Sequence, residues 1–507
     1  METGVTATLY DLLTARLAED GEREILICRE RRVTVRGLDE AARLLGAQLR
    51  ARGVATGDRV VLVAPNVPEF VVGYFGILAV GAVVVPLNPL LKTEELRYIL
   101  TDSQAVALLG LESLRPALLA AREGIGRSLP LILLDAAADG PEPEVYCRET
   151  ARPDSLPPAV PAGLDAVAAC LYTSGTTGRS KGAQLTHGNI LANIEAFGRV
   201  LQVTARDVFL TVLPLFHAYG ATVMLLEPLA TGARIVLEPR FQPEQILRAI
   251  AEHGVSVFSG VPSMFALLAA TPRPPGDYSA WRIAISGGAP LPAVVLEAFE
   301  RRHGIPIFEG YGPTECAPVL TVNPPTGRRK IGSVGPPLPG VELRVVDEAD
   351  RPLPAGQVGE IVARGPNVMR GYLNQPEETA RALRGGWYHT GDLGWRDEDE
   401  YYHIVDRKTD LIIVGGLNVY PSEVETTLMQ HPGVREVAVV GMPDPVRGEV
   451  PRAVVVPREG VLLSPQEIIQ WCRRRLANYK VPRRVELASE LPRSATGKVL
   501  KAILRQG

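Results

Sequence analysis

The chain has 507 residues, of which 46% are hydrophobic and 22% charged, and its formal net charge is −3. This composition is typical of a globular enzyme and excludes a disordered or fibrous protein. The chain has 54 Lys and Arg and 57 Asp and Glu. This near balance of charge gives no support to binding of nucleic acid or of an anionic membrane. At about 150 residues per domain, this length is enough for roughly three domains.

The five cysteines are widely separated and form neither a CxxC pair nor a Cys/His cluster at zinc spacing. This pattern predicts buried thiols in a reducing compartment. Residues 1–4 lack the features of a secretory signal. The stretch Phe70–Leu91 is uncharged and long enough to span a bilayer. Its glycines and prolines instead favour a buried helix, a turn at Gly81 and a core strand at Ala82–Val85. We expect a cytoplasmic protein with, at most, peripheral membrane contact.

Apolar runs alternate with helical patterns along the first two thirds of the chain. Leucine and alanine recur at helical spacing over 38–49, and Arg59–Val63 reads as a buried strand. The segment Ala136–Pro161 is rich in Pro, Asp and Glu and predicts a surface connection. Strands separated by helices predict parallel sheets covered on both faces. Further strands are expected at Ala105–Leu109, Leu131–Leu134, Ala166–Leu171, Val208–Val212, Ile235–Leu237, Val255–Gly260, Arg282–Ser286 and Ile305–Phe308.

The pattern changes near Gly332, where short strands and turns take over and predict a smaller β-rich unit. After Asp406 the chain reads as a compact α+β tail. The strands expected in the β-rich unit are Val341–Val346, Val358–Ala363 and Tyr401–Val405. The tail is expected to contain helix Pro421–His431, strands Glu436–Val440 and Ala453–Val456, and helix Pro465–Leu476.

A loop suited to a polyanion follows the strand expected at 166–171. Residues 172–182 read YTSGTTGRSKG, in which eight of eleven positions are Ser, Thr or Gly. Glycines let the backbone approach phosphate, hydroxyl and N–H groups donate to its oxygens, and Lys181 supplies charge. A Walker A loop is excluded, because Ser180 and Ala183 stand where its second glycine is required. The alternative interpretation is a flexible surface turn.

Four further motifs occupy the second half of the chain. Residues 309–315 read EGYGPTE and place an aromatic ring, a hydroxyl and a carboxylate on a glycine-bracketed loop after a strand. Residues 388–394 read YHTGDLG and residues 492–498 read PRSATGK. Between them, residues 406–410 read DRKTD and lead into residues 415–421, which read GGLNVYP. Each could alone be a turn, a salt-bridged pair or a solvated lysine. Their joint occurrence in this order favours a function.

This set of motifs resembles the adenylate-forming superfamily of acyl-CoA synthetases, adenylation domains and beetle luciferases, over nearly the whole chain. Within it the chain looks most like bacterial fatty-acyl-CoA ligases, on residues 285–292 (ISGGAPLP), 332–335 (GSVG) and 406–425. The resemblance implies an α/β fold. Its large N-terminal domain of stacked αβα sheets with a β-rich subdomain would span 1–405, followed by a hinge at 406–409. A small mobile α+β catalytic domain would span 410–507.

The resemblance also implies the reaction. Such enzymes join a carboxylic acid to the α-phosphate of ATP, release pyrophosphate, and pass the acyl group to the thiol of coenzyme A. ATP and coenzyme A are thus implied as co-substrates, Mg²⁺ as cofactor and a fatty acid as the acid. The first step brings two anions together, so the site must neutralise charge. No nucleic-acid partner is expected, and a homodimer is left open.

Roles for individual residues follow from the same resemblance. Thr173 to Lys181 would hold the phosphates, and Tyr311 would stack on adenine, with the loop 288–290 lining its other side. Asp392 and Arg407 would bind the ribose. The residues implied to bind ATP and AMP are Thr173, Ser174, Gly175, Thr176, Thr177, Gly178, Lys181, Gly288, Ala289, Pro290, Glu309, Gly310, Tyr311, Gly312, Asp392 and Arg407.

Four residues are implied in catalysis. Thr314 and Glu315 would position the α-phosphate and Mg²⁺, a hard cation that prefers oxygen ligands. Lys498 would bridge the carboxylate and the α-phosphate in the transition state. His217 stands where the family uses an aromatic gate beside the acyl carboxylate, although a lone histidine in an apolar run is by default a packed core residue.

At three positions the chain departs from the family's usual residue, and the resemblance also implies a role for one pair of glycines. Thr409 occupies the hinge position, where relatives usually have Asp or Lys. Gly415 and Gly416 would border the tunnel for the pantetheine arm of coenzyme A; the alternative is a bulge or turn before Asn418. Pro313 stands where relatives more commonly have Met or Leu. Ser180 stands where many relatives have Pro.

Alternative functions share most of these motifs. An aryl-acid or 4-coumarate-type CoA ligase would differ only in pocket shape. An acyl-AMP ligase loading a carrier protein would carry an insertion near the hinge, and Asp406–Glu425 contains none. A non-catalytic relative would be expected to lose Lys498 or Glu315. The absence of an acid between Asp207 and Glu227 argues against an amino-acid substrate. The apolar runs 221–226 and 317–320 fit either an acyl tail or ordinary core.

Overall fold

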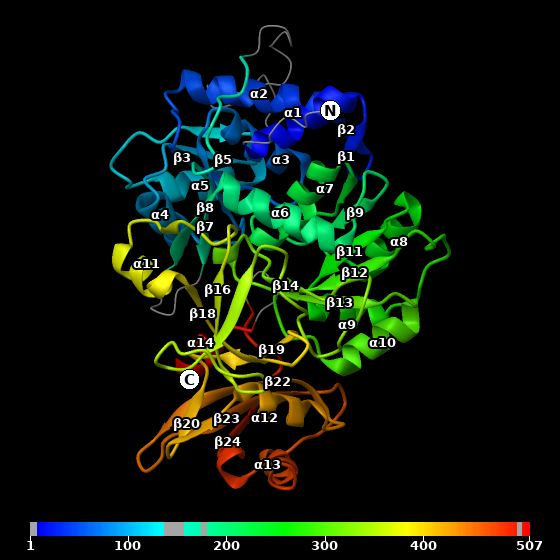
Figure 1. Ribbon diagram of the computed structural model, residues 1–507, viewed down its shortest axis with the longest axis vertical. Coiled ribbons are helices and arrows are strands. Elements are labelled where there is room, and N and C mark those ends of the chain that lie inside the picture. Colours follow the sequence, from blue (N-terminus) through cyan, green and yellow to red (C-terminus); the bar gives the residue numbers. More distant parts are fainter. Residues whose placement is uncertain (1–7, 136–156, 174–179, 494–498, 507) are drawn as a thin grey trace. The chain divides into compact units, whose positions relative to one another are not determined.

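The computed structural model describes residues 8–135, 157–173, 180–493 and 499–506 (Figure 1). It divides into two compact units, the first made of 1–342 and 363–388 and the second of 343–362 and 389–507. The expected fold class is confirmed, because parallel sheets with helices on both faces fill the large first unit. The hinge predicted at 406–409 lies inside the second unit, and the domain boundary placed there stays a prediction.

An eight-stranded sheet forms one half of the first unit, in the order β14-β13-β12-β11-β9-β10-β1-β2. The strands from β13 to β1 are parallel, as predicted. Only the edge strands β14 and β2 run antiparallel to their neighbours. The strands are β1 (Glu24–Cys28), β2 (Arg31–Thr34), β9 (Val208–Thr211), β10 (Arg234–Leu237), β11 (Val257–Gly260), β12 (Ile283–Ser286), β13 (Ile307–Tyr311) and β14 (Thr321–Val322).

Alternate residues of these strands enter two different cores, which explains their near-continuous apolar character. Phe258 of β11 packs with helices α8 (Pro243–His253), α9 (Pro262–Ala270) and α10 (Ala293–His303). Its neighbour Val257 packs with α6 (His187–Leu201) and with a π-helix at Tyr219–Leu226. Helices therefore cover both faces of the sheet.

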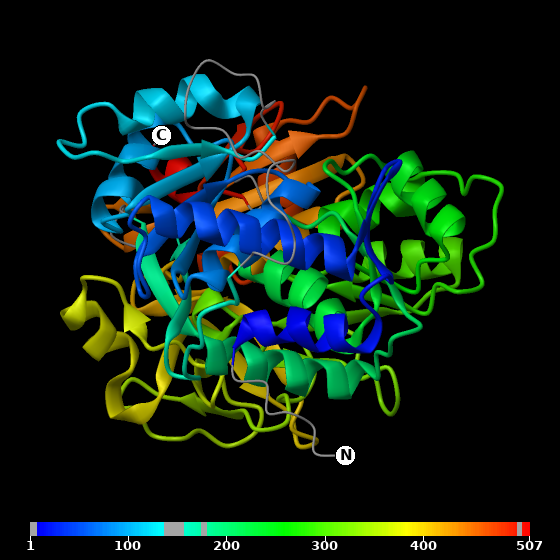
Figure 2. The same cartoon turned by 90° about the horizontal axis from the view of Figure 1, so that it is seen from above.

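A seven-stranded sheet forms the other half of the first unit, in the order β17-β8-β7-β4-β3-β5-β6. Helix α2 (Val35–Ala51) contains the periodic run expected at 38–49, and it lies beside α1 (Leu9–Asp20) and α3 (Pro68–Ala79) (Figures 1 and 2). The strands are β3 (Arg59–Val63), β4 (Val83–Leu87), β5 (Ala107–Gly110), β6 (Leu131–Leu133), β7 (Val167–Thr173), β8 (Lys181–Thr186) and β17 (Gly371–Tyr372). The other helices of the unit are α4 (Thr93–Asp102), α5 (Arg115–Arg122), α7 (Glu227–Thr231) and α11 (Pro376–Ala382).

The uncharged stretch at 70–91 folds as predicted into a helix (most of α3), a turn and strand β4. Gly81 makes the turn with φ +71°, a conformation that favours glycine. Within the described ranges, no helix is long and apolar enough to cross a membrane. Of the segment 136–161, residues 136–156 lie outside the described residues.

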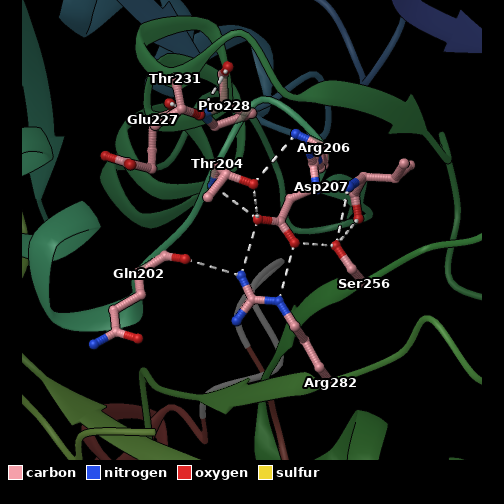
Figure 3. Close-up of polar contacts among 10 residues, drawn as sticks. Gln202, Thr204, Arg206, Asp207, Glu227, Pro228, Thr231, Ser256 and Arg282 are labelled. Atoms are coloured by element: carbon pink, nitrogen blue, oxygen red, sulfur yellow. Dashed lines mark hydrogen bonds and ion pairs between the residues drawn. The ribbon is translucent and has the colours of Figure 1, made fainter. Parts of the chain in front are cut away.

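Asp207 joins the amino ends of three parallel strands of the eight-stranded sheet (Figure 3). Its carboxylate accepts hydrogen bonds from Ser256 Oγ (2.7 Å), from Arg282 Nε (3.0 Å) and from Thr204 N (2.8 Å). These residues directly precede or lead into β11, β12 and β9, respectively. Burial alone would raise the pKa of Asp207, but the hydrogen bonds from Arg282 and Ser256 outweigh it and lower the pKa. Asp207, the nearest acid before the segment that carries His217, is therefore a structural residue.

The second unit contains two sheets. A four-stranded sheet has the order β15-β16-β18-β19, and a five-stranded sheet has the order β21-β20-β23-β22, with β24 paired to β23. Helices α12 (Pro421–Met429) and α13 (Pro465–Arg473) pack on the latter, as the tail pattern predicted. The strands are β15 (Glu342–Val346), β16 (Gly359–Arg364), β18 (Tyr388–Arg396), β19 (Tyr402–Arg407), β20 (Ile412–Val414), β21 (Leu417–Val419), β22 (Val434–Asp444), β23 (Gly448–Pro457) and β24 (Arg484–Leu487), with a last helix α14 (Lys501–Gln506).

Candidate active site

The predicted phosphate loop connects β7 to β8. Thr173 and Lys181 are paired across this antiparallel hairpin, so the two ends of the loop lie side by side. The residues between them that were expected to bind phosphate, Ser174, Gly175, Thr176, Thr177 and Gly178, lie outside the described residues. The structure thus fixes the base of the loop and its lysine.

The Lys181 side chain is largely buried and forms an ion pair. Its Nζ forms an ion pair with Glu378 of α11 and lies 5.5 Å from the ring centre of Tyr372. Burial, followed by the charge of Arg381, lowers the pKa of the Lys181 ammonium, while Glu315 opposes the shift. Neither Glu378 nor Tyr372 was predicted as a site residue.

Glu315 lies in a short 3₁₀ turn, Thr314–Cys316, that follows β13. Its buried carboxylate accepts hydrogen bonds at Oε1 from Tyr372 Oη (2.9 Å) and from Thr173 Oγ1 (3.3 Å). Both donors hold Oε1, and no described residue donates to Oε2. The structure therefore brings Thr173, Glu315 and Lys181 together around Tyr372, a residue that the sequence analysis missed.

Asparagines hold the loop that carries Glu315. Asn193 of α6 donates to the carbonyl of Val319 (2.6 Å) and accepts from its N–H (3.2 Å), while Asn367 donates to the carbonyl of Cys316 (2.8 Å). Gly312 allows a close approach, because a Cβ there would lie 2.0 Å from the carbonyl oxygen of Pro318. These contacts fix the path of the chain on both sides of Thr314 and Glu315.

Glu309 and Tyr311 lie at the carboxyl end of β13, where ligands of parallel sheets commonly bind. Glu309 is buried and its Oε2 accepts a 3.4 Å hydrogen bond from Gly332 N. Burial raises its pKa to about 7, so the carboxyl is partly protonated near neutrality. Gly310 pairs with Val322 and Tyr311 with Thr321 of β14, and the Tyr311 side chain is half-buried.

The loop expected to line adenine follows β12. Gly288, Ala289 and Pro290 are all exposed, and Gly288 has φ +80°. The preceding Gly287 packs against the π-helix, because a Cβ there would lie 3.1 Å from the ring of Tyr219. Tyr219 was not predicted as a site residue, although it lies two positions after His217.

His217 is half-buried and lies immediately before the π-helix, so it is not a fully enclosed core residue. Its Nδ1 accepts from the N–H of Tyr219 (3.2 Å), which places the proton of the neutral ring on Nε2. The preceding loop is held by Asn66, which donates to Leu213 O (2.9 Å) and accepts from Leu215 N (2.9 Å). Asn66 is a further residue that the sequence analysis missed.

The apolar runs that fitted an acyl tail belong to the core. Val223 and Met224 of the π-helix pack with Phe197 and Phe209, and Val319 joins the same cluster. Glu227, which follows the π-helix, is 1% exposed and has a pKa raised to about 8 by burial. These runs therefore give no separate support to a fatty acid.

In the second unit, Asp392 and Arg407 are cross-strand partners on β18 and β19. Arg407 Nε lies 3.0 Å from Asp392 Oδ1, and the Asp392 N–H donates to Thr390 Oγ1 (3.0 Å). Gly391 has φ +70° and its N–H donates to Glu360 Oε1 (3.1 Å). The TGD segment therefore lies in a strand rather than in a turn, and it holds a buried carboxylate beside a half-exposed guanidinium.

Three further predicted residues lie in the second unit. Gly415 and Gly416 form a two-residue hairpin turn between β20 and β21, with φ +57° and +83°. This turn, the alternative to a tunnel lining, accounts for both glycines by itself. Thr409 lies in the exposed turn after β19, and its carbonyl accepts from Arg505 (3.0 Å). Lys498 lies outside the described residues.

The donor set suits Mg²⁺ bound together with substrate. In the described parts of the chain, no group of three or more His, Cys, Asp or Glu could hold a metal by itself. Mg²⁺ commonly uses one or two carboxylates and completes its shell with water and substrate phosphates. The Oε2 atom of Glu315, beside the phosphate loop, fits such a site.

Two models of known protein families match the sequence of this chain. The model for the AMP-binding enzyme matches residues 13–373, and the model for its C-terminal domain matches 423–498. The chain belongs to the AMP-binding enzyme family. The resemblance to adenylate-forming enzymes is thereby confirmed.

Relatives of this AMP-binding enzyme differ in the acid they use. It is 41% identical to a feruloyl-CoA synthase of Amycolatopsis over 460 residues, 90% of each chain. It is 35% identical to a long-chain-fatty-acid–CoA ligase of Bacillus subtilis over 525 residues, 97% of this chain and 93% of the relative. ATP-bound MatB of Rhodopseudomonas palustris superposes with a TM-score of 0.90 at 34% identity, with 98% of both chains covered. An o-succinylbenzoate CoA synthetase (MenE) of Bacillus subtilis, with its acyl-adenylate, gives 0.86 at 33% identity and the same coverage.

Proposed function

We propose that this AMP-binding enzyme activates a carboxylic acid with ATP and transfers the acyl group to coenzyme A. A carboxylate oxygen attacks the α-phosphorus and the bond to the β-phosphate breaks, so pyrophosphate leaves. The thiol sulfur then attacks the acyl carbon, the bond to AMP breaks, and the thiol proton passes to solvent. The observation that carries the proposal is the buried Glu315 carboxylate, held by Thr173 and Tyr372 at the base of a loop that ends in Lys181.

The residues supply the charge balance that the first step needs. Lys181 would hold phosphate oxygens, and Glu315 would hold Mg²⁺, which offsets the charge of ATP when bound. Lys498 would meet the incoming carboxylate, and His217 would border it. Asp392 and Arg407 would bind the ribose. A hinge at 406–409 would let residues 410–507 serve each half-reaction in turn.

The substrate is proposed to be an aromatic acid of the hydroxycinnamate class. The 41% identity to a feruloyl-CoA synthase supports it, as does Tyr219, whose ring packs on Gly287 next to the adenine loop. A fatty acid is the second candidate, favoured by the 35% identity that extends over 97% of the chain. The burial of 221–226 in the core leaves that candidate without further support.

Release of pyrophosphate with ferulate, 4-coumarate, benzoate and C6–C18 fatty acids, with and without coenzyme A, tests both parts. We expect the highest kcat/KM with a hydroxycinnamate and formation of its CoA thioester. A tenfold or greater preference for a fatty acid would establish the second candidate. Adenylate formation without any thioester would indicate a carrier-protein ligase, and no release with any acid would contradict the function.

Thr409→Pro tests the proposed hinge, because a fixed φ should restrict the change between two poses. We expect one half-reaction to be spared and the other to be slowed at least tenfold, measured by pyrophosphate release and by transfer from supplied acyl-AMP. Normal rates for both would show that Thr409 is not the hinge.

A further inference from the structure

The lysine of the phosphate loop already has a carboxylate partner within the first unit. Lys181 Nζ pairs with Glu378 Oε2, and the two side chains are 10% and 24% exposed. An ammonium buried to this degree is costly unless it is paired and hydrogen-bonded. Lys181 can therefore reach a phosphate only by leaving or sharing Glu378.

Backbone contacts place this carboxylate beside Lys181. Tyr372 of β17 pairs with Ala183 of β8, two residues after Lys181. Helix α11 is fastened to β17, because Thr379 Oγ1 accepts from the N–H of Tyr372 (2.9 Å). A Cβ on Gly371 would lie 2.6 Å from the methyl group of Thr379, so the two elements are in close contact. The ion pair is thus built into the packing of α11 on the sheet.

Glu378 also has a second cation. Arg381, one turn further along α11, pairs with its other oxygen Oε1, and the Arg381 side chain is 69% exposed. If Lys181 turns to another anion, Glu378 keeps a guanidinium partner, so the exchange does not leave a buried carboxylate uncompensated.

We propose that Glu378 is the resting counter-ion of Lys181 and exchanges it with the β- and γ-phosphates of ATP, and with pyrophosphate. This inference rests on the proposed phosphate-binding role of Lys181. Because the carboxylate competes with phosphate for one ammonium, it weakens binding of pyrophosphate and favours its release after adenylation. Glu378 acts through Lys181 and is a positioning residue.

Calorimetric titration of the full chain with pyrophosphate tests the exchange. Glu378→Gln removes the competing charge and should tighten pyrophosphate binding by about 2- to 5-fold, the size expected for a partly exposed ion pair. Glu377→Gln is the matched control, since Glu377 is the exposed neighbour on α11, and it should change nothing. AMP lacks the β- and γ-phosphates, so its affinity should be the same in all three proteins. Unchanged or weaker pyrophosphate binding in Glu378→Gln would overturn the proposal.

A double-mutant cycle gives a second readout that a merely structural ion pair would not produce. Lys181→Gln, Glu378→Gln and the double variant should show coupling in the unfolding transition without ligand, and that coupling should vanish at saturating pyrophosphate. Coupling that persists with the ligand bound would contradict the exchange. If Glu378→Gln does not fold, Glu378→Asp replaces it, with tighter pyrophosphate binding still expected because the shorter side chain reaches Lys181 less well. If the wild type releases pyrophosphate with an acid but Glu378→Gln binds pyrophosphate with unchanged affinity, this inference alone is contradicted. If no acid gives release of pyrophosphate, the proposed function itself is contradicted.

Discussion

The two ends of the parallel strands β9, β11, β12 and β13 use polar residues in opposite ways. At the amino ends, the Asp207 carboxylate is fully bonded to Ser256, Arg282 and Thr204, and its pKa is lowered. Toward the carboxyl ends, the buried hydroxyl of Ser286 has no hydrogen-bond partner among the described residues, and burial raises the pKa of Glu309.

The difference indicates which end of this sheet serves stability and supports the proposal that the other end binds substrate. Satisfied buried groups stabilise a fold, whereas unsatisfied or destabilised ones persist where a ligand or reaction needs them. The amino end, where Asp207 holds three strands together, is therefore called the fastening end. The carboxyl end, which continues into Tyr311 and Glu315, is the proposed reacting end. The first three predictions below each change one end and leave the other intact, and the fourth concerns a turn outside both.

The largest effect is expected from Glu315→Gln. The substitution keeps the shape but removes the charge proposed to hold Mg²⁺, so acyl-AMP formation should fall by about 10²-fold or more. The Mg²⁺ concentration for half-maximal rate should rise as well, measured by pyrophosphate release across a Mg²⁺ titration. An unchanged titration would show that Glu315 only supports the loop.

Asp207→Asn breaks the opposite end. It leaves the Arg282 guanidinium beside a neutral amide and should lower the free energy of unfolding by about 2–3 kcal/mol, somewhat less than a fully buried pair because Arg282 is 40% exposed. Urea denaturation measures the loss, and kcat should stay normal well below the melting temperature. Arg206→Gln, a change at the adjacent exposed residue, serves as the control and should alter neither quantity.

Glu309→Gln sharpens the comparison through pH. An acid whose pKa is raised on folding, here to about 7, gives full stability below its unfolded value of about 4.3 and loses stability as the pH rises through 7. The variant should therefore match the wild type at pH 4 and exceed it by about 3 kcal/mol at pH 8. Identical pH profiles from urea midpoints would show that Glu309 titrates normally.

The smallest effect concerns a turn outside both ends. Because Gly415 and Gly416 have positive φ, Gly416→Ala should cost about 1 kcal/mol, while Gly416→Asn, which tolerates this conformation better, should cost less. Thermal unfolding measures the cost. If Gly416 also borders the pantetheine arm, Gly416→Leu should spare acyl-AMP formation and abolish transfer to coenzyme A. Equal loss of both half-reactions would leave the glycine with its turn role alone.

The sequence could predict the elements and motifs that are carried by local patterns. Period and composition located α2, β3, β4 and the parallel strands, because each buries a continuous or periodic apolar set. The glycine-rich and EGYGPTE motifs pointed to the two segments of the proposed phosphate site, whose described residues Thr173 and Glu315 are hydrogen-bonded. The turn at Gly415 and Gly416 was indicated only as an alternative, since two glycines suit a close ligand and a hairpin equally well.

The supporting residues could not be predicted in this way. Tyr372, Glu378, Asn66 and Asn193 reach the site through contacts across 57 to 197 residues of sequence, and no local pattern marks them. The sequence also left the role of 221–226 open, because an apolar run has the same composition whether it lines a pocket or fills a core. Only packing distinguishes the two.

Acid-dependent exchange of labelled pyrophosphate into ATP, measured in parallel for Glu315→Gln and Asp207→Asn, tests the account most directly. Both substitutions replace a carboxylate by its amide, at the reacting end and at the fastening end of the first unit. The account predicts that exchange is lost in Glu315→Gln at unchanged stability and is retained in Asp207→Asn at reduced stability. Exchange that survives in Glu315→Gln, or that disappears in folded Asp207→Asn, would contradict it.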